Sequence, residues 1–210
     1  MTDAILIVAA LNGMRSRLEC PKVPYTPEEI AAEARRAVAA GAGVVHVQAR
    51  KPDGSPAYDL SYDDIVQAVR GAVDVPISVT TQRTRQTSLG TITALFSVLR
   101  DPPDLATVNV RAPGQDLPAH REEARQILEA LDEASVRPTP TVFGVDSLGD
   151  LEVLYNDSLL TRAPYMVVAL GPTRGSGGAL AAGTPSNVLR LIDATTQQFS
   201  RFPVVVGGED

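Results

Sequence analysis

The sequence predicts an α/β protein whose parallel strands form a (β/α)8 barrel of the TIM type, with about seven of the eight strands recognisable. Apolar, β-branched runs alternate with helical patterns along the chain, which favours a parallel sheet with right-handed crossovers. The runs are almost wholly apolar, as is typical of strands covered by helices on both faces. Polar residues follow several runs, and in a barrel such residues gather at the carboxyl ends of the strands. An open, doubly wound sheet is the alternative architecture.

The expected strands are about seven short apolar runs. They span residues 5–11, 44–47, 76–81, 105–110, 139–145, 165–170 and 203–206. Polar residues that end or follow them are Asn12, His46, Thr80, Asn109, Asp146 and Glu209. No Gly-x-Gly-x-x-Gly turn follows the first run, and no phosphate loop ending in Gly-Lys-Ser/Thr is present. Ligand groups spread over many strand ends therefore favour the barrel.

The helix between the first two runs has the clearest boundaries. Thr26 is the expected N-cap, Pro27 occupies the first turn, and Glu29 completes a capping box. Apolar residues follow at helical spacing up to residue 39, and Gly41 ends the helix. Further helical patterns begin at Ser61 and extend over residues 122–134, 148–160 and 185–192.

Length and composition indicate one globular domain over residues 1–210. The chain has 210 residues, 44% hydrophobic and 21% charged, enough for a single sizeable core. The formal net charge of -6 and the lack of a basic block argue against nucleic acid or an anionic membrane as partner. Cys20 is the single cysteine, so no intramolecular disulfide can form, which fits a reducing cytoplasm. The N-terminus lacks the basic start of a secretory signal, and no apolar run approaches the roughly 20 residues that span a bilayer.

The expected site begins at the second run. His46 and Gln48 are two residues apart, so on a strand both side chains point to one face. His46 can bind a metal or transfer a proton, and the alternative is a histidine that only hydrogen-bonds at the strand end. Gln48 offers a neutral, weaker oxygen ligand in place of an imidazole. Arg50 can hold a carboxylate or phosphate, or it is an ordinary loop arginine.

Other strand ends add hydroxyl and amide groups. Thr80 and Thr81 end the third run, and Thr107 and Asn109 lie at the end of the fourth. Such groups can orient a substrate carboxylate or carbonyl, although threonine is also an ordinary strand residue.

Three further segments have both a functional and a simple structural interpretation. Glu209 and Asp210 follow the last run and can act as a ligand and a base, or they are a solvated acidic pair. The glycine-rich stretch 171–183, with Arg174, can wrap a phosphate or serve as a mobile loop. His120 is expected at the surface near a helix start.

Several segments, in order, match a set of known motifs. Residues 9–13 read Ala-Ala-Leu-Asn-Gly, similar to A-A-[LI]-T-G. Residues 40–50 resemble A-G-A-x-[IV]-[IV]-H-x-H-x-R, with His46, Gln48 and Arg50 at the last three marked positions. Residues 105–109, 167–171 and 184–189 resemble M-A-[ST]-L-N, F-V-L-G and T-P-E-N-L. In these segments the chain resembles the family of β-keto acid cleavage enzymes, the group typified by 3-keto-5-aminohexanoate cleavage enzyme.

The resemblance implies a (β/α)8 barrel that holds a divalent metal, usually zinc, and uses acetyl-CoA as co-substrate. Metal ligands would be His46, Gln48 and Glu209, the last from the segment resembling V-G-x-E-D. The implied reaction is a Claisen-type exchange, in which a β-keto acid and acetyl-CoA give acetoacetate and a new CoA thioester. The metal would polarise the keto group, and a carboxylate would manage the proton. The remaining expected roles are catalytic for Asp210 and Arg50 and substrate-binding for Asn12, Thr80, Thr81, Thr107 and Asn109.

The chain also departs from the family pattern. Gln48 replaces the second histidine, residues 80–83 replace the S-T-G-G segment, and the arginine before V-G-x-E-D is absent. In a second alignment residues 206–210 match an earlier strand, and Glu209 is then no metal ligand. We therefore expect weak or absent zinc. The leading function is an enzyme of this family, and the alternatives are a non-catalytic member that binds a small acid or acyl-CoA, or a relic stabilised by oligomerisation. We expect a homo-oligomer whichever of these functions the chain has.

Overall fold

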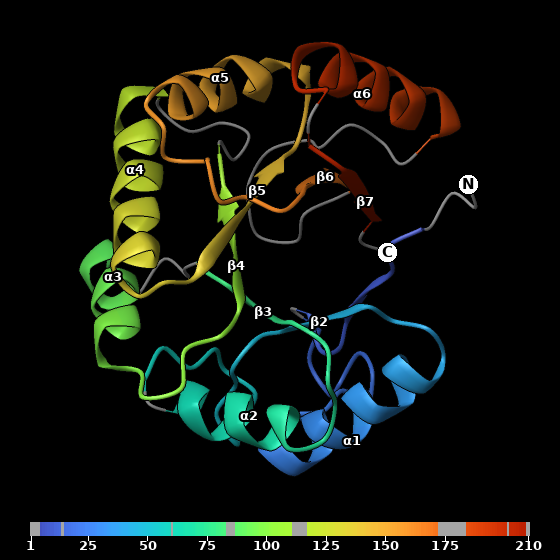
Figure 1. The fold of residues 1–210 in the computed structure, drawn as a ribbon. Coiled ribbons are helices and arrows are strands. Elements are labelled where there is room, and N and C mark those ends of the chain that lie inside the picture. Colours follow the sequence, from blue (N-terminus) through green and yellow to red (C-terminus); the bar gives the residue numbers. More distant parts are fainter. Residues whose placement is uncertain are drawn as a thin grey trace. The chain divides into compact units, whose positions relative to one another are not determined.

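The fold of this chain is given by a computed structural model, drawn in Figure 1. It describes residues 5–13, 15–59, 61–82, 87–110, 117–171, 184–200 and 202–208, without the side chains of residues 117–120 and 208. Contacts divide the chain into two compact units, which are described one by one. The first comprises Met1–Ala106 with Glu133–Val136, and the second comprises Thr107–Asp132 with Arg137–Asp210.

Parallel strands alternate with helices along the described chain. The elements through the fourth strand are β1 (Val8–Ala10), α1 (Pro27–Ala39), β2 (Val44–Val47), α2 (Ser61–Arg70), β3 (Ile77–Thr80), α3 (Leu89–Val98) and β4 (Leu105–Asn109). Those that follow are α4 (Leu117–Glu133), β5 (Arg137–Val142), the short 3-10 helix η1 (Val145–Ser147), α5 (Leu148–Asn156), β6 (Met166–Leu170), α6 (Pro185–Gln198) and β7 (Val204–Gly208).

The strand order confirms the predicted fold class. The sheet runs β1-β2-β3-β4-β5-β6-β7 in chain order. Strand β1 pairs with β2, and β2 with β3, in parallel. Strand β6 likewise pairs in parallel with β5 and β7. A helix follows each of β1 to β6, so the described residues form a TIM-type (β/α) barrel sheet with seven strands.

Helix α1 forms where its end signals predict it. The Thr26 hydroxyl accepts a hydrogen bond from Glu29 N–H at 3.3 Å, and the Glu29 carboxylate accepts one from Thr26 N–H at 3.1 Å. This is the predicted capping box. Helix α1 packs beside α2 in the first unit, and their fully buried side chains include Ile30 and Ile65.

The structure differs from the prediction at several element boundaries. Strand β1 covers only Val8–Ala10 of the predicted run 5–11, and Ile5 is 86% exposed. Helix α4 starts at Leu117, before the expected residue 122, and α6 continues to Gln198. Helix α3 was not predicted, because Leu89–Val98 is apolar on most sides and shows little helical periodicity. Its N-cap Ser88, which accepts from Thr91 N–H at 3.1 Å, is the signal that marks it.

Candidate functional site

The carboxyl end of β2 carries the first group of polar side chains. His46 lies opposite Ser78 of β3 in the parallel register, and its Nδ1 is 3.0 Å from the Ser78 hydroxyl. Ser78 is completely buried, whereas the imidazole keeps part of its surface exposed. Burial lowers the pKa of His46 to about 4. The ring is therefore neutral near pH 7, the form that can bind a metal or donate one N–H.

Asn12 binds the main chain of Gln48 rather than its side chain. Gln48 N–H donates to Asn12 Oδ1 at 2.9 Å, and Asn12 Nδ2 donates to Gln48 O at 2.7 Å. The same Nδ2 lies 3.3 Å from Pro24 O. These bonds continue the β1–β2 pairing, which ends with Leu11 N–H on His46 O. The Asn12 carboxamide thus takes the place of a strand peptide, and Asn12 is only 5% exposed.

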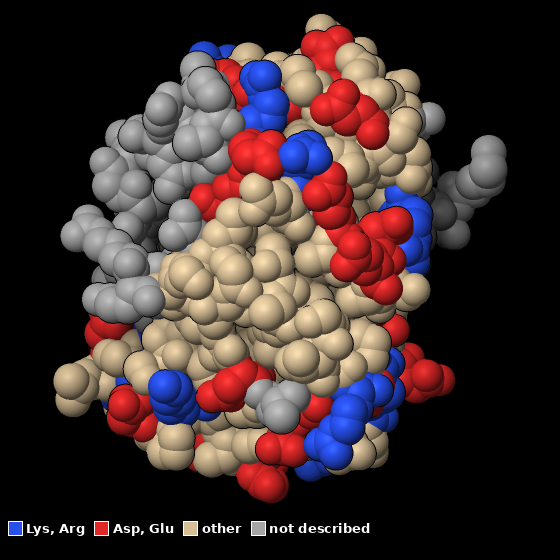
Figure 2. All heavy atoms as spheres, turned by 90° about the vertical axis from the view of Figure 1, so that its left-hand side faces the viewer, with Lys and Arg blue, Asp and Glu red and all other residues tan. Residues whose placement is uncertain are grey.

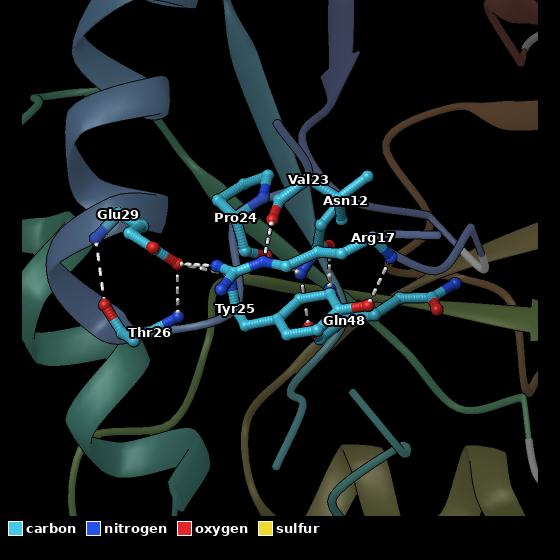
Figure 3. A network of polar contacts seen from close by, with 8 residues as sticks. All are labelled: Asn12, Arg17, Val23, Pro24, Tyr25, Thr26, Glu29 and Gln48. Carbon is cyan, nitrogen blue, oxygen red and sulfur yellow. Dashed lines mark hydrogen bonds and ion pairs between the residues drawn. The ribbon is translucent and has the colours of Figure 1, made fainter. Parts of the chain in front are cut away.

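The Gln48 side chain has no comparable task. Its carboxamide extends away from Asn12 and Tyr25 in Figure 3. Among the described residues it makes no hydrogen bond, and it is partly exposed. Gln48 follows His46 by two residues and lies one position beyond the last residue of β2. The common pocket expected for these two side chains stays a prediction.

Arg50 is a buried guanidinium held by two backbone carbonyls. It is 7% exposed, donates through Nη1 to Gly54 O at 2.7 Å, and donates through Nη2 to Gly13 O. Its buried Nε has no partner, and no carboxylate of the described residues forms an ion pair with it. Burial lowers the pKa of Arg50. Arg50 therefore ties the segments after β1 and β2 together and retains one free donor.

Tyr25 lies beside both arginines of this region. The Arg17 guanidinium lies 4.3 Å from the ring centre and that of Arg50 lies 5.5 Å from it. The Tyr25 hydroxyl accepts from Arg17 N–H at 2.9 Å. Arg17 in turn pairs with Glu29, whose carboxylate also accepts from Tyr25 N–H at 2.8 Å (Figure 3). The backbone N–H of Tyr25, then that of Thr26, with a smaller effect of Arg17, holds the pKa of Glu29 below its usual value.

The end of β3 brings a threonine to the His46 side of the sheet. Thr80 follows Ser78 by two residues and therefore shares its face. Thr80 is 9% exposed, and its hydroxyl accepts from Gln82 N–H at 3.0 Å. Thr81 is the residue after β3 and is buried. Thr80 thus has a strand position on the side of His46.

The other expected site residues lie in the second unit or outside the described residues. Thr107 and Asn109 end β4 in the second unit, two residues apart and partly exposed. Glu209 and Asp210, the expected metal ligand and base, lie outside the described residues, as does Arg174. His120 belongs to α4, but its side chain is not among those described.

The donors in the described ranges do not fit a zinc site by themselves. His46 supplies one imidazole and Gln48 one neutral carboxamide oxygen, whereas a protein zinc site takes about three or four ligands. Within these ranges no group of three His, Cys, Asp or Glu side chains can hold a metal ion.

Ser78 was not recognised from the sequence as a site residue, because a small hydroxyl inside an apolar run is ordinary for a strand.

Positive and negative side chains are mixed on the surface formed by the described residues. Figure 2 shows acidic and basic side chains interspersed on one face. On α4, for example, Arg125 pairs with Glu122 and Glu129 at 2.7 Å. In the part of the chain that the structure describes, no helix has the length and hydropathy needed to cross a membrane.

Comparison with known proteins points to one family. A family model described as beta-keto acid cleavage enzyme matches residues 4–207. A 3-keto-5-aminohexanoate cleavage enzyme of Fusobacterium nucleatum subsp. nucleatum is 40% identical over 72 residues, 33% of this chain and 26% of that protein. A 3-dehydrocarnitine:acetyl-CoA trimethylamine transferase of Rhizobium meliloti is 28% identical over 175 residues, 81% of this chain and 54% of that protein. The chain spans about half the length of these relatives, or less.

Solved structures share the fold at low identity. The ternary complex of ObcA with a C4-CoA adduct and oxalate has a TM-score of 0.66 at 18% identity, over 89% of this chain and 52% of that chain. A type I 3-dehydroquinate dehydratase from Clostridium difficile has a TM-score of 0.59 at 14% identity, over 97% of this chain and 75% of that chain. At these identities the likeness concerns the barrel fold alone.

Proposed function

Because the chain belongs to the beta-keto acid cleavage enzyme family, we propose that it exchanges a β-keto acid with acetyl-CoA. The acyl part of the keto acid would pass to CoA, and its carboxymethyl carbon would join the acetyl group as acetoacetate. The names of the relatives support a reaction of this class, since they include a keto acid cleavage enzyme and an acetyl-CoA-dependent transferase.

The observation that carries this proposal is the arrangement at the end of β2. His46, Gln48 and Arg50 follow one another at two-residue spacing, and each is held by a specific contact to Ser78, Asn12 or the Gly13 and Gly54 carbonyls. The side chains of His46 and Arg50 and the main chain of Gln48 are fixed in this way, and groups held in advance can orient a small acid with little loss of entropy on binding.

Each remaining site residue has a proposed role. Arg50 would place a fixed positive charge near the substrate carboxylate, and Asp210 would move the proton. The proposed substrate contacts are Asn12, Thr80, Thr81, Thr107 and Asn109. For Asn12 this contact is indirect, because its carboxamide is engaged with the main chain of Gln48 and Pro24.

For the metal, we propose that zinc binding is weak or absent, since His46 and Gln48 would need Glu209 as a third ligand. A carboxamide oxygen is a poor replacement for an imidazole in such a site. This observation also favours the second candidate function, a non-catalytic member that binds a small acid or acyl-CoA. We further propose a homo-oligomer that works in the cytoplasm.

A turnover assay separates the two functions. The full chain, with metal content measured by elemental analysis, is incubated with acetyl-CoA and a panel of β-keto acids. If the chain is an enzyme, acetoacetate and a new CoA thioester form in equal amounts, and the Arg50→Ala variant forms them more slowly. Binding of a keto acid without either product, with and without added zinc, supports the non-catalytic function. Light scattering of the same sample measures the oligomeric state.

A further inference from the structure

Two unused hydrogen-bond donors face the same side at the end of β2. His46 engages its Nδ1 with Ser78, so its other ring nitrogen, Nε2, remains free of partners among the described residues. The Gln48 carboxamide likewise has no partner there. The bonds of Asn12 extend the β1–β2 pairing to residue 48, so strand geometry places the two side chains on one face with their origins roughly 7 Å apart. Both are long enough to reach a common atom of a small ligand.

The Ser78 contact selects one tautomer of His46. The Ser78 hydroxyl is completely buried, and its one hydrogen-bond partner among the described residues is His46 Nδ1. A buried hydroxyl that only accepted would leave its own hydrogen unpaired, which costs about 1–3 kcal/mol. Ser78 therefore donates to Nδ1, and the proton of the neutral ring sits on Nε2. This tautomer presents an N–H group, not a lone pair, to the free side.

The Asn12 contact fixes Gln48 in a corresponding way. Three hydrogen bonds join the Asn12 carboxamide to main-chain groups: its Nδ2 donates to Pro24 O and Gln48 O, and its Oδ1 accepts from Gln48 N–H. They hold residue 48 extended one step beyond the last residue of β2. This backbone sets the direction in which the Gln48 side chain leaves the chain, and its terminal NH₂ can donate to an acceptor.

From these contacts we propose that His46 Nε2–H and the Gln48 side-chain N–H form a two-donor site that binds the keto oxygen of a β-keto acid without a metal ion. Ser78 and Asn12 are the positioning residues of this site. Donors that are fixed in advance stabilise negative charge as it develops on a carbonyl oxygen. The inference rests on the proposed function for its ligand class, and it assigns Gln48 to hydrogen bonding rather than to metal coordination.

The first test observes the tautomer of His46 directly. The chain has 2 histidines, so ¹⁵N-histidine NMR of the full chain in EDTA gives two ring systems, and His120→Gln assigns them. We expect the Nε2–H tautomer for His46, a shift of its Nδ1 signal in Ser78→Ala because the hydroxyl that donates to Nδ1 is removed, and the return of that signal in Ser78→Thr. Acetoacetate should shift His46 Nε2 and the Gln48 side-chain amide while leaving His120 unchanged. A Nδ1–H tautomer, or acetoacetate binding that requires added zinc, overturns the proposal.

The second test is a double-mutant cycle between Asn12 and Gln48. At residue 48, Asn12 bonds to the main chain and not to the side chain. The losses in the free energy of unfolding by urea for Asn12→Ala and Gln48→Ala should therefore be additive. Their effects on acetoacetate affinity should not be additive. Each single variant is expected to bind roughly tenfold more weakly, and the double variant also about tenfold rather than about a hundredfold.

The outcomes separate this inference from the proposed function. Additive losses of affinity in a wild type that binds acetoacetate refute the two-donor site alone. A wild type that binds no acetoacetate, with or without zinc, refutes the proposed function and with it the ligand of this site. If Asn12→Ala does not fold, Asn12→Ser removes the same carboxamide with a smaller change in polarity and enters the same cycle.

Discussion

Substitution of Gly54 by alanine should destabilise the segment that holds Arg50. Gly54 has φ +85°, a left-handed conformation that L-residues rarely adopt. A Cβ at this position would lie 2.7 Å from Tyr25 Cε2 and 2.7 Å from Tyr25 Oη. Tyr25 is 6% exposed and lies against two guanidinium groups, so its ring cannot move aside freely.

Gly41 provides a matched control for the backbone term. Its φ is +106°, and a Cβ there would meet nothing within 4 Å. The left-handed backbone costs an L-residue about 1–2 kcal/mol, which applies to both substitutions. Overpacking against the Tyr25 ring adds about 1–3 kcal/mol, which applies to Gly54 alone. We therefore expect losses of roughly 2–5 kcal/mol for Gly54→Ala and roughly 1–2 kcal/mol for Gly41→Ala.

Guanidinium unfolding at pH 7, followed by circular dichroism, measures both losses. Adding Tyr25→Leu to Gly54→Ala should recover part of the difference, because the smaller side chain relieves the overlap. Equal losses for the two glycine variants would show that Tyr25 does not confine residue 54, and the overlap inferred for Gly54→Ala would then be wrong.

Three further predictions concern the same unit. Glu29 has a lowered pKa, so its stabilising effect is present above the unfolded pKa near 4.5 and disappears as the pH falls through the folded pKa. In urea unfolding, Glu29→Gln should therefore lower the free energy of unfolding by less than about 1 kcal/mol at pH 7 and by almost nothing at pH 3. Arg50→Lys cannot keep both carbonyl contacts and should lose about 1–3 kcal/mol in the same assay, whereas an unchanged midpoint argues against a structural role for the guanidinium fork. Gln48→His should raise zinc occupancy in elemental analysis, and a value equal to that of the parent would mean that a third ligand is lacking.

The features that sequence could predict are those with local causes. The alternation of apolar runs and helices depends on neighbouring residues, and so does the capping box of Thr26 and Glu29. Helix α3 escaped prediction because an apolar segment without polar periodicity does not distinguish a helix from a strand.

The contacts of the candidate site depend on strand register, which a single sequence does not contain. Ser78 meets His46 because β3 pairs with β2 at that residue, 32 positions further along the chain. Asn12 was expected at a strand end, but its bonds to the main chain of residue 48 follow only from the β1–β2 pairing. Arg50 does not continue the strand face of His46, because β2 ends at Val47 and Arg50 forms an antiparallel bridge with Pro56.

The use of main-chain atoms in the Asn12 contact has an evolutionary consequence. Asn12 recognises N–H and C=O groups that almost any residue at position 48 provides. Substitution at position 48 can therefore change the chemistry offered to a ligand while the extension of β2 stays in place. Many different side chains can therefore occur at this position with little loss of folding stability. This makes position 48 a suitable starting point for divergence in substrate choice and for the directed evolution of new substrate specificities.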